Sequence, residues 1–276
     1  MTLQHRLGQI AKHAVLLFFL LVTIAPLYFV IVTSFKTNPE FYDNLWLPGE
    51  SLRWENYTEA WTRGHLGEYF GNSLYVVLTS VALVILFAMP AGYALARLRV
   101  PGSRPLITFM AGSLIIPAEA TLVPLFVLIA SLKLINTREN LILVYTGWSL
   151  ALTIYIFHNY FLTLPVDIAE AARVDGASEV QIFLRVMLPL SWPAVATGVI
   201  FNFLFIWGEF LWALISTRSD SVRTIPLGLF RFQDQFGTDW VQLSAAISIT
   251  IVPLIVVFVF FQRYFIRGLT AGAVKA

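Results

Sequence analysis

Two carboxylates, Glu119 and Glu209, stand in stretches of the chain that are otherwise apolar. A charge near the centre of a lipid bilayer costs roughly 3 kcal/mol or more, so such residues usually face a cavity or a partner. Trp207 and Trp212 flank Glu209, and Asn202 precedes it in the same apolar run. Carboxylates and aromatic rings together can bind a hydroxyl-bearing solute, because hydroxyls donate to carboxylates and ring faces stack on CH groups. These five residues are the candidates for a substrate pathway.

Two other interpretations of Glu119 and Glu209 remain open. Each carboxylate can instead anchor one helix to another through hydrogen bonds. Both can also relay protons, which would make the chain a proton-coupled secondary transporter. Such transporters usually contain inverted repeats of many spans, and no repeat is visible in this sequence.

No set of residues indicates an enzyme. A Gly-rich phosphate loop of the Walker type is absent, so ATP hydrolysis is expected on a separate subunit. The four histidines (His5, His13, His65 and His158) lack the spacing of metal ligands, and the chain contains no Cys. We therefore expect no metal and no cofactor bound by this chain. The formal net charge of +2 gives no indication of a nucleic-acid partner.

A polar, helix-forming segment at 164–188, which we call the elbow, separates two long apolar runs. Pro165 suits the first turn of a helix, and Gly176 tolerates a backbone bend that a residue with a Cβ would resist. Ser178 and Gln181 have the spacing of a capping box, so a second helix can begin there. The elbow is therefore predicted to be a short helix-turn-helix that exposes small residues.

The elements that must position these residues are membrane-spanning helices. The 276-residue chain is 58% hydrophobic and 12% charged, and its mean hydropathy is +0.76, far more apolar than a soluble domain. Helices satisfy every backbone group within lipid, whereas open strand edges do not. The fold class is therefore predicted as an all-α integral membrane protein with six transmembrane helices, at about 13–34, 70–96, 105–131, 140–163, 189–216 and 241–262.

The distribution of Lys and Arg predicts how these spans are oriented. With both termini, the 97–104 turn and the elbow on one face, that face carries 10 of the 18 Lys and Arg residues. The other face carries 10 of the 16 acidic residues, mostly on the longer polar stretches 35–68 and 217–240. Positive residues concentrate in the cytoplasm, so the termini and the elbow are expected there. The two polar stretches are expected to be extracytoplasmic.

The elbow also resembles a known family signature. Residues 170–172 read Glu-Ala-Ala, Gly176 follows after three residues, and Leu188-Pro189 completes the pattern. This spacing is similar to the signature loop of ABC-importer permease subunits, with Val186 where Ile is usual. The wider sequence resembles the carbohydrate-uptake branch, of which the maltose importer is the best-known type. The run around Glu209 resembles the family's Trp-Asn-Glu-Phe segment, although Gly208 replaces the Asn and removes a side-chain amide.

The resemblance implies a function and a set of partners. The chain would be one transmembrane domain, 1–276, with a permease core at about 69–264, in the bacterial cytoplasmic (inner) membrane. It would form the translocation pathway of an ATP-driven importer for a sugar or sugar-like solute. Its partners would be a second permease subunit, two ATP-binding subunits that hold ATP-Mg, and an extracytoplasmic solute-binding protein. The cytoplasmic elbow, between spans four and five, would be a coupling helix whose ATPase-docking residues are Glu170, Ala171, Ala172, Asp175 and Gly176.

Overall fold

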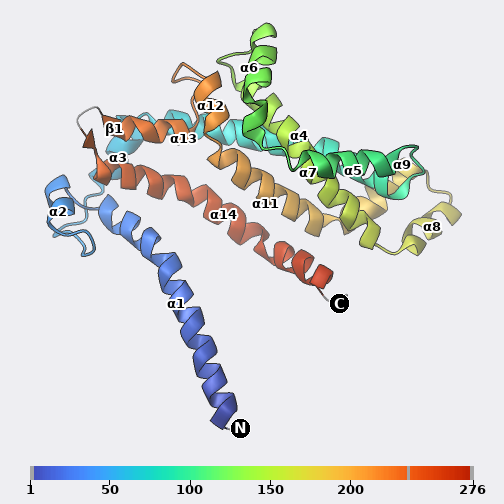
Figure 1. The fold of residues 1–276 in the computed structure, drawn as a ribbon, viewed down its shortest axis with the longest axis horizontal. Coiled ribbons are helices and arrows are strands. Elements are labelled where there is room, and N and C mark those ends of the chain that lie inside the picture. The colour runs from blue at the N-terminus through green and yellow to red at the C-terminus, as the bar shows by residue number, and fades with distance from the viewer. Residues whose placement is uncertain (1–2, 235–236, 274–276) are drawn as a thin grey trace. The chain divides into compact units, whose positions relative to one another are not determined.

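Helices make up nearly all of the regular structure (Figure 1). The computed structural model of the chain describes residues 3–234 and 237–273. Lys275, one of the basic residues counted above for the C-terminus, lies outside the described residues. Within them, the exception to helix is one antiparallel pair of two-residue strands, β1 (Gln233–Asp234) and β2 (Gly237–Thr238). The predicted all-α fold class is confirmed at this level.

Two compact units divide the chain. Unit 1 comprises Met1–Gly67 and Gly228–Val252, and unit 2 comprises Glu68–Leu227 and Pro253–Ala276. Unit 1 holds α1 (Leu3–Ser34), α2 (Asn38–Asp43), α3 (Glu55–Thr62), η3 (Leu229–Phe232) and the first part of α14 (Trp240–Ala273). Unit 2 holds the rest of α14, most of α4 (Leu66–Arg97) and of α13 (Ile225–Gly228), and all helices between them.

Buried polar contacts order the first polar stretch of unit 1. The Lys36 ammonium is buried and donates hydrogen bonds to the backbone carbonyls of Asn44 (2.6 Å) and Leu45 (3.2 Å). The side-chain amide of Asn56 on α3 donates to the carbonyl of Ser34, where α1 ends. These bonds close the loop after α1 and fasten α3 to it, so the stretch is folded rather than a loose connection.

Among the described residues, four helices are long and apolar enough to cross a membrane: Gly8–Ser34, Leu66–Arg97, Arg138–Thr163 and Trp240–Arg263. Two bent helix pairs raise the number to as many as six if each pair is one span. The first pair joins Ser103–Ser113 to Ala118–Ser131 at 99°, and the second joins Glu179–Leu190 to Trp192–Gly208 at 73°. The predicted spans at 105–131 and 189–216 are therefore not continuous helices.

The break in the third predicted span lies at Pro117. The segment α5 (Ser103–Ser113) ends four residues before it, and the short η1 (Ala118–Thr121), which begins directly after it, leads into α6 (Leu122–Ser131). Proline lacks an N–H and restricts the residue before it, so a regular helix cannot run through this position unchanged. Figure 1 shows α6 turned away from α5.

The fifth predicted span breaks at both ends of α11 (Trp192–Gly208). Ser191 separates it from the short α10 (Leu188–Leu190), and the extended backbone of Glu209 (φ −69°, ψ 128°) separates it from α12 (Leu211–Ser216). The second break was not predicted. It places a carboxylate beside the free N–H groups that begin a helix.

The core of unit 2 forms where α4 and α7 (Arg138–Thr163) pack together with the elbow. Its buried side chains include Met89 and Tyr93 on α4 and Phe157 and Phe161 on α7. At Gly92 the two backbones come so close that an added Cβ would lie 2.7 Å from the Phe157 Cβ and 3.0 Å from a backbone nitrogen of α7. Glycine is therefore required there by the close packing of α4 and α7.

The elbow has the predicted helix-turn-helix form. It consists of α8 (Val166–Val174), α9 (Glu179–Ile182) and the π-helical segment η2 (Phe183–Met187). Gly176 makes the turn with φ +81°, a conformation that favours glycine, and Ser178 with Gln181 forms the predicted capping box. Pro165 precedes α8 instead of lying in its first turn.

Candidate functional site

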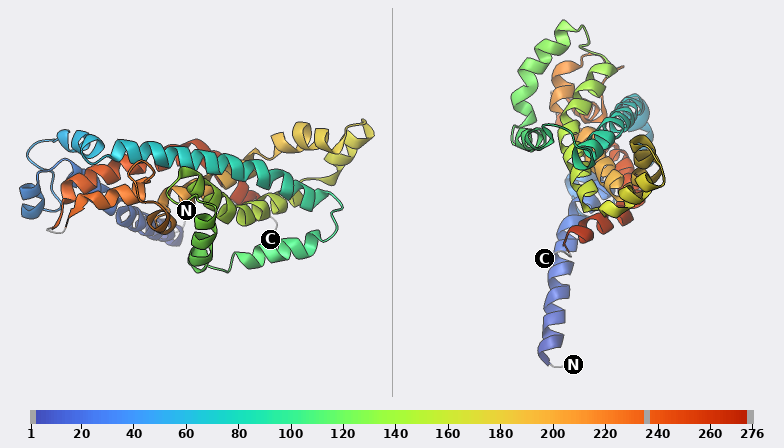
Figure 2. Two further views of the ribbon diagram at one scale, coloured as in Figure 1. Left: turned by 90° about the horizontal axis from the view of Figure 1, so that it is seen from above. Right: turned by 90° about the vertical axis from the view of Figure 1, so that its right-hand side faces the viewer.

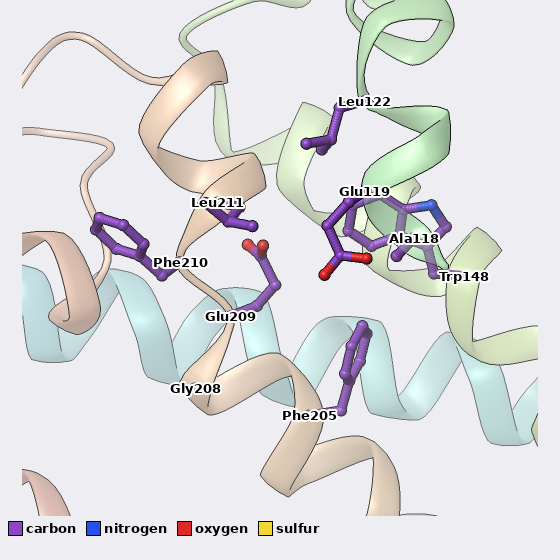
Figure 3. Close-up of a pocket in the computed structure, with 9 residues that line it drawn as sticks. All are labelled: Ala118, Glu119, Leu122, Trp148, Phe205, Gly208, Glu209, Phe210 and Leu211. Atoms are coloured by element: carbon purple, nitrogen blue, oxygen red, sulfur yellow. The ribbon is translucent and has the colours of Figure 1, made fainter. Parts of the chain in front are cut away.

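A cavity of about 310 Å³ lies in unit 2 beside the break at Pro117 and the break at Glu209. This volume is at the lower end of the roughly 300–1,000 Å³ typical of small-molecule sites. Figure 3 shows the carboxylates of Glu119 and Glu209 turned toward the same space from different elements. The lining residues are Ala118, Glu119, Leu122, Trp148, Phe205, Gly208, Glu209, Phe210 and Leu211.

The Glu209 carboxylate is held by three hydrogen bonds. It accepts one from the Tyr145 hydroxyl on α7 (2.5 Å) and two from the backbone N–H groups of Trp212 (2.8 Å) and Ala213 (3.3 Å). The backbone donors belong to the first turn of α12, where the helix dipole favours negative charge. Glu209 therefore caps α12 and ties it to α7, as the helix-anchor interpretation predicts.

The Glu119 carboxylate differs. It lies exposed on η1 and makes no side-chain hydrogen bond or ion pair with the part of the chain that the structure describes. The segment that carries it is nevertheless fixed, because the Trp148 indole N–H on α7 donates to the Thr121 hydroxyl at 3.2 Å. Glu119 is thus a positioned carboxylate whose oxygens are free to accept hydrogen bonds from a ligand.

The other three predicted pathway residues are buried and do not line this cavity. Asn202 donates to the Thr153 hydroxyl (2.9 Å) and to a backbone carbonyl of its own helix. The Trp207 ring on α11 meets Phe70 on α4 edge to face, with centroids 5.7 Å apart. The Trp212 indole N–H donates to a side-chain oxygen of α7 at 3.2 Å. All three hold helices together in the structure.

The aromatic faces in the cavity come instead from Trp148 and Phe205. Their ring centroids are 6.4 Å apart at an angle of 66°, an edge-to-face arrangement. Sequence analysis did not select either residue. The sequence does place Trp148 three residues after Tyr145, so the two share one face of a helix. Tyr145 donates to Glu209, so this face is the one that turns toward the cavity.

The elbow is a second, separate candidate site. Four of the five predicted docking residues, Glu170, Ala171, Asp175 and Gly176, are exposed, whereas Ala172 is half-buried against the core cluster. A Cβ built on Gly176 would meet no atom within 4 Å among the described residues, so there is open space at the turn. Figures 1 and 2 place α8 at one extremity of unit 2.

An ion pair stiffens the elbow. The Arg173 guanidinium on α8 donates to both Glu179 oxygens on α9, with Nε–Oε1 at 2.6 Å and Nη2–Oε2 at 3.3 Å. The hydrogen bond from Arg173 keeps the pKa of the Glu179 carboxyl below its usual value. The pair joins the two arms of the turn, so the elbow can move as one body.

Known proteins resemble the chain over most of its length. The family model described as "Binding-protein-dependent transport system inner membrane component" matches residues 88–271. The diacetylchitobiose uptake system permease protein of Streptomyces coelicolor is 35% identical, over 96% of this chain and 88% of its own. The arabinooligosaccharides transport system permease protein of Halalkalibacterium halodurans is 36% identical, over 94% and 93%.

A solved structure shares the fold. It is a bacterial ABC transporter involved in the import of the acidic polysaccharide alginate, and it superposes with a TM-score of 0.84 at 22% identity, over 96% of this chain and 99% of that one. None of these comparisons supports a proton-coupled transporter. The matched family and the relatives together show that the chain belongs to the binding-protein-dependent transport system inner membrane components, the permease subunits of ABC importers.

Proposed function

We propose that this permease subunit forms part of the pathway for a carbohydrate or sugar-like solute. The observation that carries the proposal is the cavity, where the free carboxylate of Glu119 lies with the rings of Trp148 and Phe205. Carboxylate oxygens accept hydrogen bonds from sugar hydroxyls, and aromatic faces cover the CH groups of the ring. Relatives named for diacetylchitobiose and for arabinooligosaccharides support the same class of solute.

The proposal includes six spans: the four continuous helices, the bent pair of α5 and α6, and the predicted span 189–216, which contains α11. In this arrangement the termini and the elbow are cytoplasmic, the stretches 35–68 and 217–240 are extracytoplasmic, and the permease core spans about 69–264. The excess of Lys and Arg on the cytoplasmic side supports it. A cysteine replacing the exposed Ser51 should react with an impermeant thiol reagent added outside intact cells, whereas one replacing Ser178 should not. The reverse pattern of labelling would invert the topology.

The elbow is proposed as the coupling helix that docks on an ATP-binding subunit. Its exposed small residues leave room for close packing, and its internal ion pair lets it transmit force as a rigid body. In the full assembly, a second permease subunit would complete the pathway, two ATP-binding subunits would hold ATP-Mg, and a solute-binding protein would deliver the sugar. This chain itself would carry no cofactor.

Uptake by the purified complex tests the proposed solute. The subunit is co-expressed with its partner subunits and reconstituted in vesicles, and ATP-dependent accumulation of labelled mono- and oligosaccharides is measured with amino acids as the comparison. We expect accumulation of at least one saccharide and of no amino acid. Accumulation of an amino acid without any saccharide would contradict the proposal.

Co-purification tests the docking role of the elbow. Ala171→Trp adds bulk at an exposed position, so the subunit should fold, but the ring should overfill the docking contact. Overpacking costs about 1–3 kcal/mol, which should lower recovery of the ATP-binding subunit about tenfold. Val166→Trp, a change of similar size at an exposed residue of α8 outside the signature, serves as the control. Wild-type recovery with Ala171→Trp would remove the docking role.

A further inference from the structure

The end of α4 contacts the elbow at several points, although about 70 residues of chain separate them. Tyr93 is buried, and its hydroxyl donates to Oε2 of Glu179 on α9 at 3.3 Å. The same carboxylate receives the Arg173 guanidinium from α8. One carboxylate therefore joins three elements: α4, α8 and α9.

The Tyr93 ring lies between the two flanks of the elbow. It meets Phe161, near the end of α7, edge to face with centroids 5.4 Å apart, and Phe183, where η2 begins, at 5.2 Å. Phe161 precedes the elbow in the chain, and Phe183 lies in its last part. A movement of the end of α7 or of the start of η2 therefore pushes on the Tyr93 ring.

Arg97 contacts the first flank from the same helix. Its guanidinium Nη2 donates to the backbone carbonyls of Phe161 and Leu164, where α7 ends and the extended connection to α8 begins. A cation at the end of a helix satisfies carbonyls that have no partner within the helix. Tyr93 and Arg97 are four residues apart, so they project from one face of α4.

We propose that Tyr93 and Arg97 are positioning residues that clamp both flanks of the elbow to α4. The chain itself connects the elbow only to α7 and, through α10, to α11. With the clamp, a displacement of the elbow also carries α4, which already touches α7 backbone to backbone at Gly92. The elbow, α4 and α7 then move as one body, as a rigid alternation between two states requires. The inference rests on the proposed docking of the elbow on the ATP-binding subunit.

The ratio of solute transported to ATP hydrolysed tests the clamp. In reconstituted complexes, Tyr93→Phe removes one hydroxyl and keeps the ring, so assembly and ATP hydrolysis should stay close to wild type. Solute transported per ATP should fall about tenfold or more, the effect of losing one hydrogen bond to a charged group. Tyr155→Phe is the matched control, because the half-buried Tyr155 hydroxyl on α7 makes no hydrogen bond with the described residues. An unchanged ratio in Tyr93→Phe, or an equal fall in Tyr155→Phe, would overturn the proposal.

A double variant tests whether Tyr93 acts through Glu179. If both belong to one linkage, Tyr93→Phe combined with Glu179→Gln should transport no worse per ATP than the poorer single variant. Losses that multiply would overturn the linkage. Arg97→Lys, which keeps the charge but not the forked donor, should lower the same ratio. The two proposals fail in different ways. If the elbow does not dock, Ala171→Trp keeps wild-type recovery of the ATP-binding subunit, whereas if there is no clamp, Tyr93→Phe keeps the wild-type ratio of solute transported to ATP hydrolysed.

Discussion

Two of the helix breaks in unit 2 each bring a carboxylate to one cavity, but they leave the carboxylate in opposite conditions. Glu209, at the break before α12, accepts three hydrogen bonds, two of them from the helix that it starts. Glu119, on η1 at the other break, has no side-chain partner among the described residues. A carboxylate in an apolar run is therefore structural when it accepts hydrogen bonds from the first N–H groups of a helix. It is free for a ligand when it does not.

The largest expected effect is the loss of the Glu209 anchor. In Glu209→Ala, the Tyr145 hydroxyl and two backbone N–H groups lose their acceptor, and each unpaired buried group costs about 1–3 kcal/mol. We expect a clear fall in the thermal unfolding temperature and in the yield of complex in detergent. Glu119→Ala is the control and should unfold at the wild-type temperature. If Glu209→Ala and Glu119→Ala unfolded at the same temperature, Glu209 would not be a structural anchor.

The next effect concerns transport through Glu119. Glu119→Gln keeps the size of the side chain but replaces a charged acceptor with a neutral one, and hydrogen bonds to charged groups contribute about 1.5–3 kcal/mol. Transport at a fixed concentration of loaded binding protein should fall about tenfold or more, without loss of thermal stability. Glu209→Gln measured beside it should retain more transport per folded complex. Full transport by Glu119→Gln would exclude the residue from the pathway.

The smallest effect isolates one bond of the anchor. Tyr145→Phe removes the hydroxyl that donates to Glu209 and leaves the two backbone donors in place. Stability should fall by about 1–2 kcal/mol, less than in Glu209→Ala, and transport per folded complex should be unchanged. Thermal unfolding of the two single variants and the double variant measures this, since a shared interaction makes their effects less than additive. Strict additivity would show that the hydroxyl stabilises something other than Glu209.

Local chemistry made part of this arrangement predictable. The break near Glu119 follows from prolines that remove N–H donors, and the turn of the elbow follows from Gly176 and a capping box. These features depend on residues only a few positions apart. The carboxylates themselves were identifiable because charge is costly in an apolar run.

The rest depends on contacts that no local pattern specifies. The break at Glu209 relies on Tyr145, 64 residues away in the chain, and the apolar run around it looked like one continuous span. Trp207, before that break, and Trp212, after it, are both buried, and the rings of Trp148 and Phe205 line the cavity instead. Which face of an apolar helix is buried is weakly encoded when nearly all its residues are hydrophobic.

The contact between α4 and α7 at Gly92 bears on leakage. A pathway for large polar solutes must not conduct protons or ions between transport cycles, and seams between helices are routes for such leaks. At Gly92 the two helices are in direct contact, with no room for an added Cβ. We therefore expect this level of the subunit to contribute to a barrier against such leaks.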